Sequence, residues 1–424
     1  MDLNRRQMLM AAAALPVAGR ADALPPPVRS GAASAPPDDE AYWAGVAGHY
    51  DVVPGITQLE NGNWGMMAKP VLRVYEAAIE RVNRETSYYA RRGMGPDQIA
   101  VQKRVAAKLG VAPDEIAFTR NATEALKALI GGYNGLRPGD AVLYADLDYD
   151  SMQACCDSLK MRRGVDIVQI ALPEPATHQG LIDCYAAALD AHPRVRLILL
   201  THLSHRTGLV IPVREIIAMA RARGVDAIVD AAHSWGQLDF ALPDLDADFV
   251  GLNLHKWIGA PLGVGALYSR RDKLDRIAPD MATAPPFSPK AQSRVHTGTV
   301  DFAAQLSVPA ALDFQDAIGD APRAGRLRHL RDLWAEPLRG VPGIEILTPN
   351  DPRLHGGITS FRLSGKTSEA DNIAIAKRLL DDYRIFTVHR SGPARGACVR
   401  VTPALFNNAN DMARLVAALQ DMLR

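Results

Sequence analysis

Two stretches that close buried strands decide the fold: Ile228-Val-Asp-Ala-Ala-His233 and Asn253-Leu-His-Lys-Trp-Ile-Gly-Ala-Pro-Leu-Gly-Val-Gly265. Asp230 ends an apolar run in the first, and Lys256 stands between an apolar run and a turn rich in glycine and proline in the second. Strands that are buried on both faces have such continuous apolar runs. Because parallel strands present their carboxyl ends at one edge of an α/β sheet, we expect the acid and the amine to face the same cleft.

Strand and helix patterns alternate through the middle of the chain. Apolar runs predict strands at 115–120, 140–145, 196–201, 226–230, 248–253 and 263–268, with helices at 122–129 and 213–223. This alternation is typical of an α/β domain with a mostly parallel central sheet. The C-terminal part predicts strands at 358–363, 385–389 and 398–402 and helices at 368–383 and 410–423, with Ser368 as an N-cap. We expect a large domain over 46–310 and a smaller α+β domain over 311–424, and the N-terminal part of the large domain can pack on the small one.

The first 23 residues have the pattern of an export signal. Arg5 and Arg6 precede a short alanine-rich apolar run, and Ala21-Asp-Ala23 is an A-x-A cleavage pattern. The paired arginines resemble a twin-arginine signal, with a Sec signal or a disordered tail as alternatives. We therefore expect use of the twin-arginine (Tat) export machinery, a periplasmic location and no membrane span in the mature protein. Residues 24–45, rich in Pro, Ala and Ser, are expected to form a linker without fixed structure.

Composition and charge argue against several classes of function. The chain has 48 basic and 47 acidic residues, so it offers no electrostatic footprint for nucleic acid or an anionic membrane. Its four cysteines lack metal-ligand spacing and do not suggest a disulfide scaffold, so we expect no metal and buried, inert thiols at Cys155, Cys156, Cys184 and Cys398.

An acid and a lysine in one cleft are the pair that pyridoxal-5′-phosphate (PLP) chemistry requires. A lysine amine forms a Schiff base with the cofactor aldehyde and, once freed, carries the α-proton of the substrate. A carboxylate beside the pyridine nitrogen keeps the ring protonated, so that the ring acts as an electron sink. The sequence therefore predicts PLP as cofactor, with Lys256 as its anchor and Asp230 as the partner of the pyridine nitrogen.

The D-A-A-H and H-K-W-x-G-x-P-x-G-x-G pattern resembles class V of the fold-type I PLP enzymes. This family includes cysteine desulfurases, isopenicillin N epimerase-like proteins and kynureninases, and the resemblance spans residues 60 to about 415. It implies the α/β architecture of fold-type I transferases and a homodimer with shared active sites. It also implies a small-molecule or peptide-like amine as substrate.

The resemblance also assigns contacts to the cofactor phosphate. It places there Asn253, His255, Thr123 and the backbone of Ala122, whose strand-to-helix junction suits an anion because helix N-terminal N–H groups point toward it. A plain capping box is the alternative for this junction. Thr299 is expected to reach the phosphate of the neighbouring subunit.

Four further side chains receive roles from the resemblance. Tyr149 is expected to stack on the PLP ring and to act with Lys256 and Asp230 in catalysis, although simple packing is the alternative. His233 is expected to hydrogen-bond the phenolic oxygen of PLP. Arg400, in the stretch Cys398-Val-Arg-Val-Thr402, is expected to fork onto the substrate α-carboxylate, with a surface salt bridge as the alternative. His205 stands where the family has asparagine near cofactor and substrate, so its role is open.

Departures from the family pattern narrow the reaction. Cysteine desulfurases carry a nucleophilic cysteine on the loop before the arginine strand, and residues 389–397 contain none. We therefore predict that the chain is not a cysteine desulfurase, and nothing favours kynureninase. The pattern is nearest to isopenicillin N epimerase-like proteins, whose exported members act on peptide-like secondary metabolites, including siderophore side chains.

The predicted function is a PLP enzyme acting on an amino group by transfer, epimerisation, elimination or oxidative decarboxylation. A periplasmic solute-binding protein and a catalytically degenerate PLP-fold scaffold are the competing hypotheses. The sequence does not rank the residues at the substrate mouth, where Arg206 or Arg390 could meet a second substrate carboxylate or simply be solvated. The other candidates for the mouth are Trp64, Tyr88, Tyr89 and Arg91.

Overall fold

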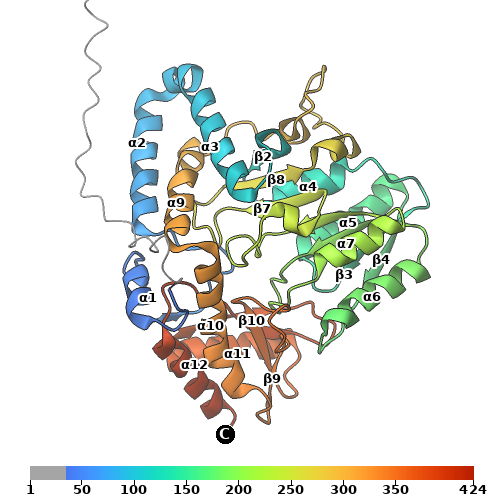
Figure 1. Ribbon diagram of the computed structural model, residues 1–424. Helices are drawn as coiled ribbons and strands as arrows, with labels where there is room; N and C mark the ends of the chain where they lie inside the picture. Colours follow the sequence, from blue (N-terminus) through green and yellow to red (C-terminus); the bar gives the residue numbers. More distant parts are fainter. Residues whose placement is uncertain (1–34) are drawn as a thin grey trace, which may run out of the picture.

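A seven-stranded sheet forms the centre of the molecule, in a computed structural model that describes residues 35–424 (Figure 1). The export signal predicted at 1–23 lies outside the described residues. The strand order is β2-β8-β7-β6-β5-β3-β4, and β8 is the one antiparallel strand in this sheet. The strands are β2 (Ile116–Thr119), β3 (Ala141–Ala145), β4 (Asp166–Ile170), β5 (Val195–Thr201), β6 (Asp226–Asp230), β7 (Phe249–Asn253) and β8 (Gly265–Ser269).

Side-chain alternation divides the apolar residues of these strands between two cores. In β3, Leu143 joins the core on one face of the sheet, and its neighbours Val142 and Tyr144 join the core on the other. Both faces are therefore covered by helices, as in other mostly parallel sheets. The helices of this domain are α2 (Lys69–Arg92), α3 (Met94–Leu109), α4 (Ala122–Gly132), α5 (Asp150–Arg163), α6 (His178–Ala191), α7 (Val213–Ala222), α8 (Phe302–Leu306) and α9 (Val308–Ile318).

The prediction that residues 24–45 form a linker without fixed structure is wrong for the part that the structure describes, which begins at residue 35. Helix α1 (Glu40–Ala47) begins at the N-cap Asp39, whose side chain accepts a hydrogen bond from the backbone of Tyr42. Trp43 is only 1% exposed, and the guanidinium of Arg326 lies over its ring while bonding to Glu40. This helix could not be predicted from the Pro- and Ala-rich composition of the segment, because its position depends on the burial of one tryptophan, Trp43.

The C-terminal part forms its own sheet and core. The sheet has the order β12-β13-β10-β9, and all of its pairs are antiparallel. A two-residue parallel pair between β1 (Thr57–Gln58) and β11 (Ile385–Phe386) attaches the N-terminal segment to this domain. The remaining elements are β9 (Ile344–Ile346), β10 (Thr359–Leu363), β12 (Val388–Arg390), β13 (Cys398–Val401), α10 (Asp320–Leu338), α11 (Glu369–Tyr383) and α12 (Ala409–Met422).

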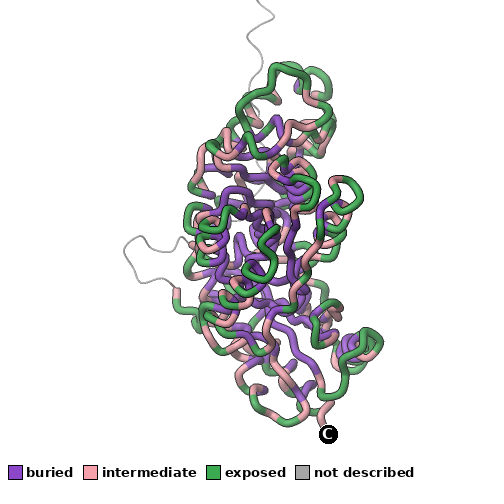
Figure 2. The backbone as a smooth tube through the Cα atoms, turned by 90° about the vertical axis from the view of Figure 1, so that its right-hand side faces the viewer, coloured by how far each residue is buried: buried purple, intermediate pink, exposed green. Residues whose placement is uncertain are grey.

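The boundary expected at 310/311 falls inside a helix. α9 runs on from Val308 to Ile318 and packs into the core of the large sheet. Gly319, with φ of +92°, separates α9 from α10. Within α10 the chain passes from one core to the other, since Leu327 belongs to the first and Trp334 to the C-terminal core. Figure 2 shows buried backbone running continuously through the middle of the molecule and into the C-terminal part.

The other predicted elements are confirmed, with small differences. Ser368 caps α11 by accepting a hydrogen bond from the backbone of Asp371. The strand expected at 385–389 divides into β11 and β12, which belong to different sheets. Between residues 35 and 424, no helix has the length and apolar character needed to cross a membrane.

Candidate active site

A cavity of about 620 Å³ opens between the large sheet and the C-terminal sheet. Its volume lies within the range that is usual for small-molecule sites. It is reached by the carboxyl ends of β6 and β7, where the sequence predicted an acid and an amine. All the predicted site residues except Thr299 line it: Ala122, Thr123, Tyr149, His205, Asp230, His233, Asn253, His255, Lys256 and Arg400.

Lys256 lies in the turn after β7 and sends its amine into this cavity. Its Nζ is 2.8 Å from Nε2 of His233. Burial, followed by the nearby charge of Arg400, lowers the pKa of Lys256. A lysine amine that is deprotonated near neutral pH is a nucleophile and a proton acceptor.

Asp230 closes β6 on the same side of the cavity. Its Oδ1 accepts a hydrogen bond of 2.8 Å from the backbone N–H of Ala232, and no described residue donates to Oδ2. Burial raises the pKa of this carboxyl, while the Ala232 N–H and the charge of Lys256 act in the opposite direction. The arrangement leaves one carboxylate oxygen available to a cationic or N–H group of a bound molecule.

The N-terminus of α4 forms one end of the cavity. The N–H of Ala122 is already bonded to Oδ1 of Asn253 at 2.8 Å, and the Asn121 side chain accepts from the N–H of Glu124. Among the described residues, none accepts from the N–H of Thr123. In this structure the free donor of the turn is the N–H of Thr123, and the phosphate contact of the Ala122 N–H stays a prediction.

His255 also lines the cavity, and its ring is held by the backbone. Its Nδ1 lies 3.1 Å from the carbonyl oxygen of Val264, which fixes the orientation of the ring. Burial lowers the pKa of His255 to about 4. An anion bound beside the ring would favour its protonated form and raise that pKa again.

Three aromatic rings in the cavity lining lie next to one another. Tyr149 meets His205 edge-on at 5.2 Å, and His205 stacks beside His233 with 6.4 Å between ring centroids. Nδ1 of His205 and Nδ1 of His233 are both buried without a described hydrogen-bond partner. Burial lowers the pKa of each histidine, so both rings are neutral, and each has an Nδ1 atom without a described partner.

Arg400, which is expected to bind a substrate carboxylate, forms an ion pair with Glu60 in this structure. Its Nη2 donates to both carboxylate oxygens of Glu60, at 2.6 and 2.8 Å, and its Nη1 donates to the carbonyl of His205 at 2.7 Å. Glu60 also accepts from the backbone N–H groups of Gly62 and Asn63. Arg400 lines the cavity and is paired with Glu60 in this structure, and its contact with a substrate carboxylate stays a prediction.

The segment around Glu60 is the part of the site that the sequence interpretation missed. A Cβ at Gly62 would lie 2.5 Å from Nη2 of Arg400, and a Cβ at Gly65 would lie 1.7 Å from the carbonyl oxygen of Lys256. Gly65 also donates to the carbonyl of His255 at 2.8 Å. The two glycines in Glu60-Asn-Gly-Asn-Trp-Gly65 were the available signal, because close backbone approach demands glycine.

The model of the family Aminotransferase class-V matches residues 73–411. The chain belongs to the class V aminotransferase family. The isopenicillin N epimerase of Amycolatopsis lactamdurans is 29% identical over 399 residues, which cover 90% of this chain and 98% of that protein. Probable cysteine desulfurase 2 of Mycobacterium leprae is 28% identical over 337 residues, 74% of this chain and 78% of that protein. A solved C-DES mutant with glycine covalently linked to its PLP cofactor shares the fold, with a TM-score of 0.74 at 22% identity over 87% of this chain and 97% of that one.

PLP is the cofactor of this class V family member, and the residues present fit it. The free oxygen of Asp230 suits a protonated pyridine nitrogen. The free N–H of Thr123 and the helix N-terminus suit the phosphate. The unpartnered imidazole nitrogens in the wall are buried polar atoms whose cost a bound polar ring would relieve.

The remaining candidates of the class V site divide clearly. Trp64 and Arg390 line the cavity, whereas Tyr88, Tyr89 and Arg91, at the far end of α2, do not. Arg206 is only 2% exposed, bonds to the carbonyl of Asp146 and to Asp150, and does not line the cavity. Thr299 is exposed and outside the cavity, and its role toward a neighbouring subunit stays a prediction. Homodimers are typical of the family.

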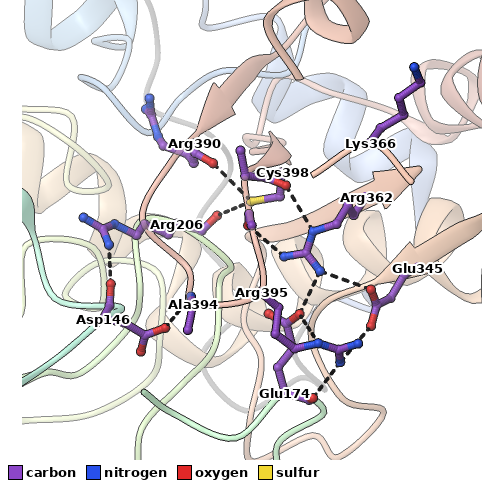
Figure 3. A network of polar contacts seen from close by, with 12 residues as sticks. Asp146, Glu174, Arg206, Glu345, Arg362, Lys366, Arg390, Ala394, Arg395 and Cys398 are labelled. Carbon is purple, nitrogen blue, oxygen red and sulfur yellow. Dashed lines mark hydrogen bonds and ion pairs between the residues drawn. The ribbon is translucent and has the colours of Figure 1, made fainter. Parts of the chain in front are cut away.

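The cysteines lie away from the cavity lining. Cys398 is fully buried in β13, and its Sγ contacts the carbonyl oxygens of Arg206 and Arg390 (Figure 3). Burial raises the pKa of its thiol to about 11. Cys156 is also buried, whereas Cys155 and Cys184 are only half-buried, so the prediction of buried thiols is wrong for these two. Burial still raises the pKa of all three. Over residues 35–424 there is also no cluster of three or more His, Cys, Asp or Glu side chains suited to a metal.

Proposed function

We propose that this class V enzyme acts on the amino group of an amino acid or peptide-like metabolite, in an aminotransferase- or epimerase-like reaction. The observation that carries the proposal is the close pair of Lys256 and His233 beside the half-free carboxylate of Asp230. The similarity to isopenicillin N epimerase along nearly the whole chain supports it. A homodimer with shared sites belongs to the same proposal.

The residues of the chain divide the work of proton transfer and charge stabilisation. PLP, when bound, supplies an electron sink for the negative charge that develops on the substrate carbon. Lys256, with its lowered pKa, takes up a proton at Nζ, and His233 at 2.8 Å holds the amine in position. Asp230 keeps a negative charge where the ring nitrogen needs a partner.

We further propose that the chain does not form a persulfide as a cysteine desulfurase does. A cysteine nucleophile requires an accessible thiolate, and none of the four cysteines lines the cavity. The burial of Cys398 and the raised pKa of its thiol support the proposal. Several relatives carry the names cysteine desulfurase or desulfhydrase, so elimination from a sulfur-containing amino acid is tested together with epimerisation.

The proposed place of action is the periplasm, reached through the twin-arginine route. Its support is Arg5-Arg6 with the apolar run and the Ala21-Asp-Ala23 pattern, which lie outside the described residues. The combination of an export signal and a PLP site motivates a peptide-like secondary metabolite, such as a siderophore side chain, as substrate. Cell fractionation with N-terminal sequencing tests this part, and an uncleaved protein confined to the cytoplasm would overturn it.

The activity is tested by following α-proton exchange into D₂O by NMR with a panel of amino acids and amino-terminal peptides. We expect exchange with the wild-type holoenzyme and loss of exchange in Lys256→Ala. The control Arg395→Ala changes an exposed arginine outside the cavity and should exchange at the wild-type rate. Wild-type protein that binds the panel without exchanging protons would favour a solute-binding or scaffold role.

A further inference from the structure

Two consecutive residues at the end of β12, Arg390 and Ser391, line the cavity, and each carries a polar atom without a described partner. Nε of Arg390 and Oγ of Ser391 are both buried without a described hydrogen-bond partner. The one hydrogen bond of the Arg390 guanidinium runs to the carbonyl of His389, at 3.2 Å. Both residues line the cavity that holds Lys256. Buried donors without partners are costly, which indicates that a bound molecule completes them.

The neighbouring arginines are all paired, which sets Arg390 apart. Arg362 bonds to Glu174 at 2.7 Å and to Glu345 at 3.1 Å, and Arg395 approaches the same two carboxylates. In Figure 3 the side chain of Arg390 points away from this network. Only the backbone carbonyl of Arg390 takes part in it, through its contact with Cys398. Arg390 forms no ion pair with any described carboxylate.

The charges around Arg390 make it the uncompensated cation of the cavity. Glu60 neutralises Arg400, whose two terminal nitrogens are spent on Glu60 and on the carbonyl of His205. On the rim, Glu369 faces His389 at 3.5 Å rather than Arg390. Burial, followed by the charge of Arg400, lowers the pKa of Arg390 to about 10, so the guanidinium remains charged at neutral pH.

We propose that Arg390 and Ser391 form the subsite that binds a carboxylate of the amine substrate. The proposal deepens the proposed function and rests on it, because it places a second recognition point in the cavity of Lys256. A planar guanidinium with a neighbouring hydroxyl matches a carboxylate. The substrate class is therefore an amine that also carries a carboxylate, and the pairing of Arg400 with Glu60 leaves Arg390 as the arginine of the cavity lining without a carboxylate partner.

The subsite is tested with glutarate, which carries carboxylates and no amine, and with its neutral diamide glutaramide. Both are titrated calorimetrically into the PLP-loaded enzyme. We expect glutarate to bind the wild type and to bind Arg390→Ala about 10- to 100-fold more weakly, as for loss of a hydrogen bond to a charged group. Ser391→Ala should weaken it about 2- to 10-fold, and Arg390→Lys should lie between wild type and Arg390→Ala.

Controls separate recognition from structural damage. Arg395→Ala, an arginine of the same loop that lies outside the cavity lining, should bind glutarate as the wild type does. Unchanged glutarate binding in Arg390→Ala, or no glutarate binding by the wild type, would overturn the subsite. An equal loss for glutaramide would show a structural role and would also overturn it. The PLP content of each variant is read separately, so that failure of the proposed function is seen independently.

Discussion

Arg400 holds Glu60 through one guanidinium nitrogen, Nη2, which donates to both carboxylate oxygens at 2.6 and 2.8 Å. Both side chains are almost completely buried, with 1% and 5% exposed. Burial alone would raise the pKa of Glu60, but the charge and hydrogen bond of Arg400 outweigh it and hold the pKa below its usual value. The pair joins the N-terminal segment to β13 and holds Arg400, which lines the cavity.

Removing Glu60 should destabilise the protein strongly. Glu60→Ala leaves a buried guanidinium without its counter-ion, and loss of one partner of such a pair costs about 3–5 kcal/mol. The expected result is a clear decrease in the urea midpoint of the holoenzyme. Lys377→Ala breaks an exposed pair with Asp381 on α11 and should leave the midpoint unchanged. Equal midpoints for Glu60→Ala and wild type would contradict the role given to the pair.

Stability should fall on mild acidification because His202 is buried in neutral form. Burial lowers the pKa of this histidine from 6.5 to about 4. The unfolded chain then binds a proton that the folded chain does not, so stability decreases as pH falls from 6.5 toward 4, by about 3 kcal/mol at most for this one group. His202→Gln should flatten the dependence of the urea midpoint on pH in this window. The matched control, substitution of the exposed His296 by Gln, should leave the pH dependence of the urea midpoint unchanged. If His202→Gln also left this pH dependence unchanged, His202 would be excluded as its source.

Gly65 should tolerate no side chain. Its Cβ would lie 1.7 Å from the carbonyl oxygen of Lys256, so Gly65→Ala must move the turn that carries the reactive amine. We expect a loss of stability at or above the upper end of about 1–3 kcal/mol and a reduced PLP content after purification. Gly131→Ala is the matched control, because a Cβ there meets nothing within 4 Å and an alanine favours the helix by about 0.5–1 kcal/mol. A fully loaded and stable Gly65→Ala would disprove the close packing.

Asp230→Asn should retain the fold and lose the reaction. The amide oxygen can still accept from the N–H of Ala232, so the local hydrogen bond persists. The charge beside the ring nitrogen disappears, and we expect α-proton exchange to slow by about 10²- to 10³-fold. The measurement is the exchange rate at saturating substrate together with PLP content. An exchange rate close to that of wild type would remove Asp230 from the catalytic group.

Much of the site could be predicted because its residues end strands. Asp230 and Lys256 each follow a buried apolar run, and parallel strands bring such ends together whatever lies between them in the sequence. Thr123 and Tyr149 follow the same rule at the starts of α4 and α5. The residues of the large sheet were recognisable for a related reason, since continuous apolar runs leave few alternatives to strands with two covered faces.

The features that could not be predicted from the sequence depend on contacts between segments that are distant in the chain. Glu60 has no local pattern that marks it, because its partner Arg400 lies on β13 in the other domain. The helix at Glu40–Ala47 depends on Trp43 and Arg326, which no periodicity connects. The hydrogen bond from the Ala122 N–H to Asn253 could likewise be found only once β7 was placed beside α4.

Reduction of the purified protein with borohydride, followed by peptide mass mapping, tests the central claim most directly. The pair of Lys256 and His233 predicts a visible absorption band that borohydride removes, with the pyridoxyl mass on the peptide that contains Lys256. Lys256→Ala should show neither the band nor the mass. An unmodified Lys256 peptide in PLP-saturated wild-type protein, or the mass on another lysine, would contradict the account of the site.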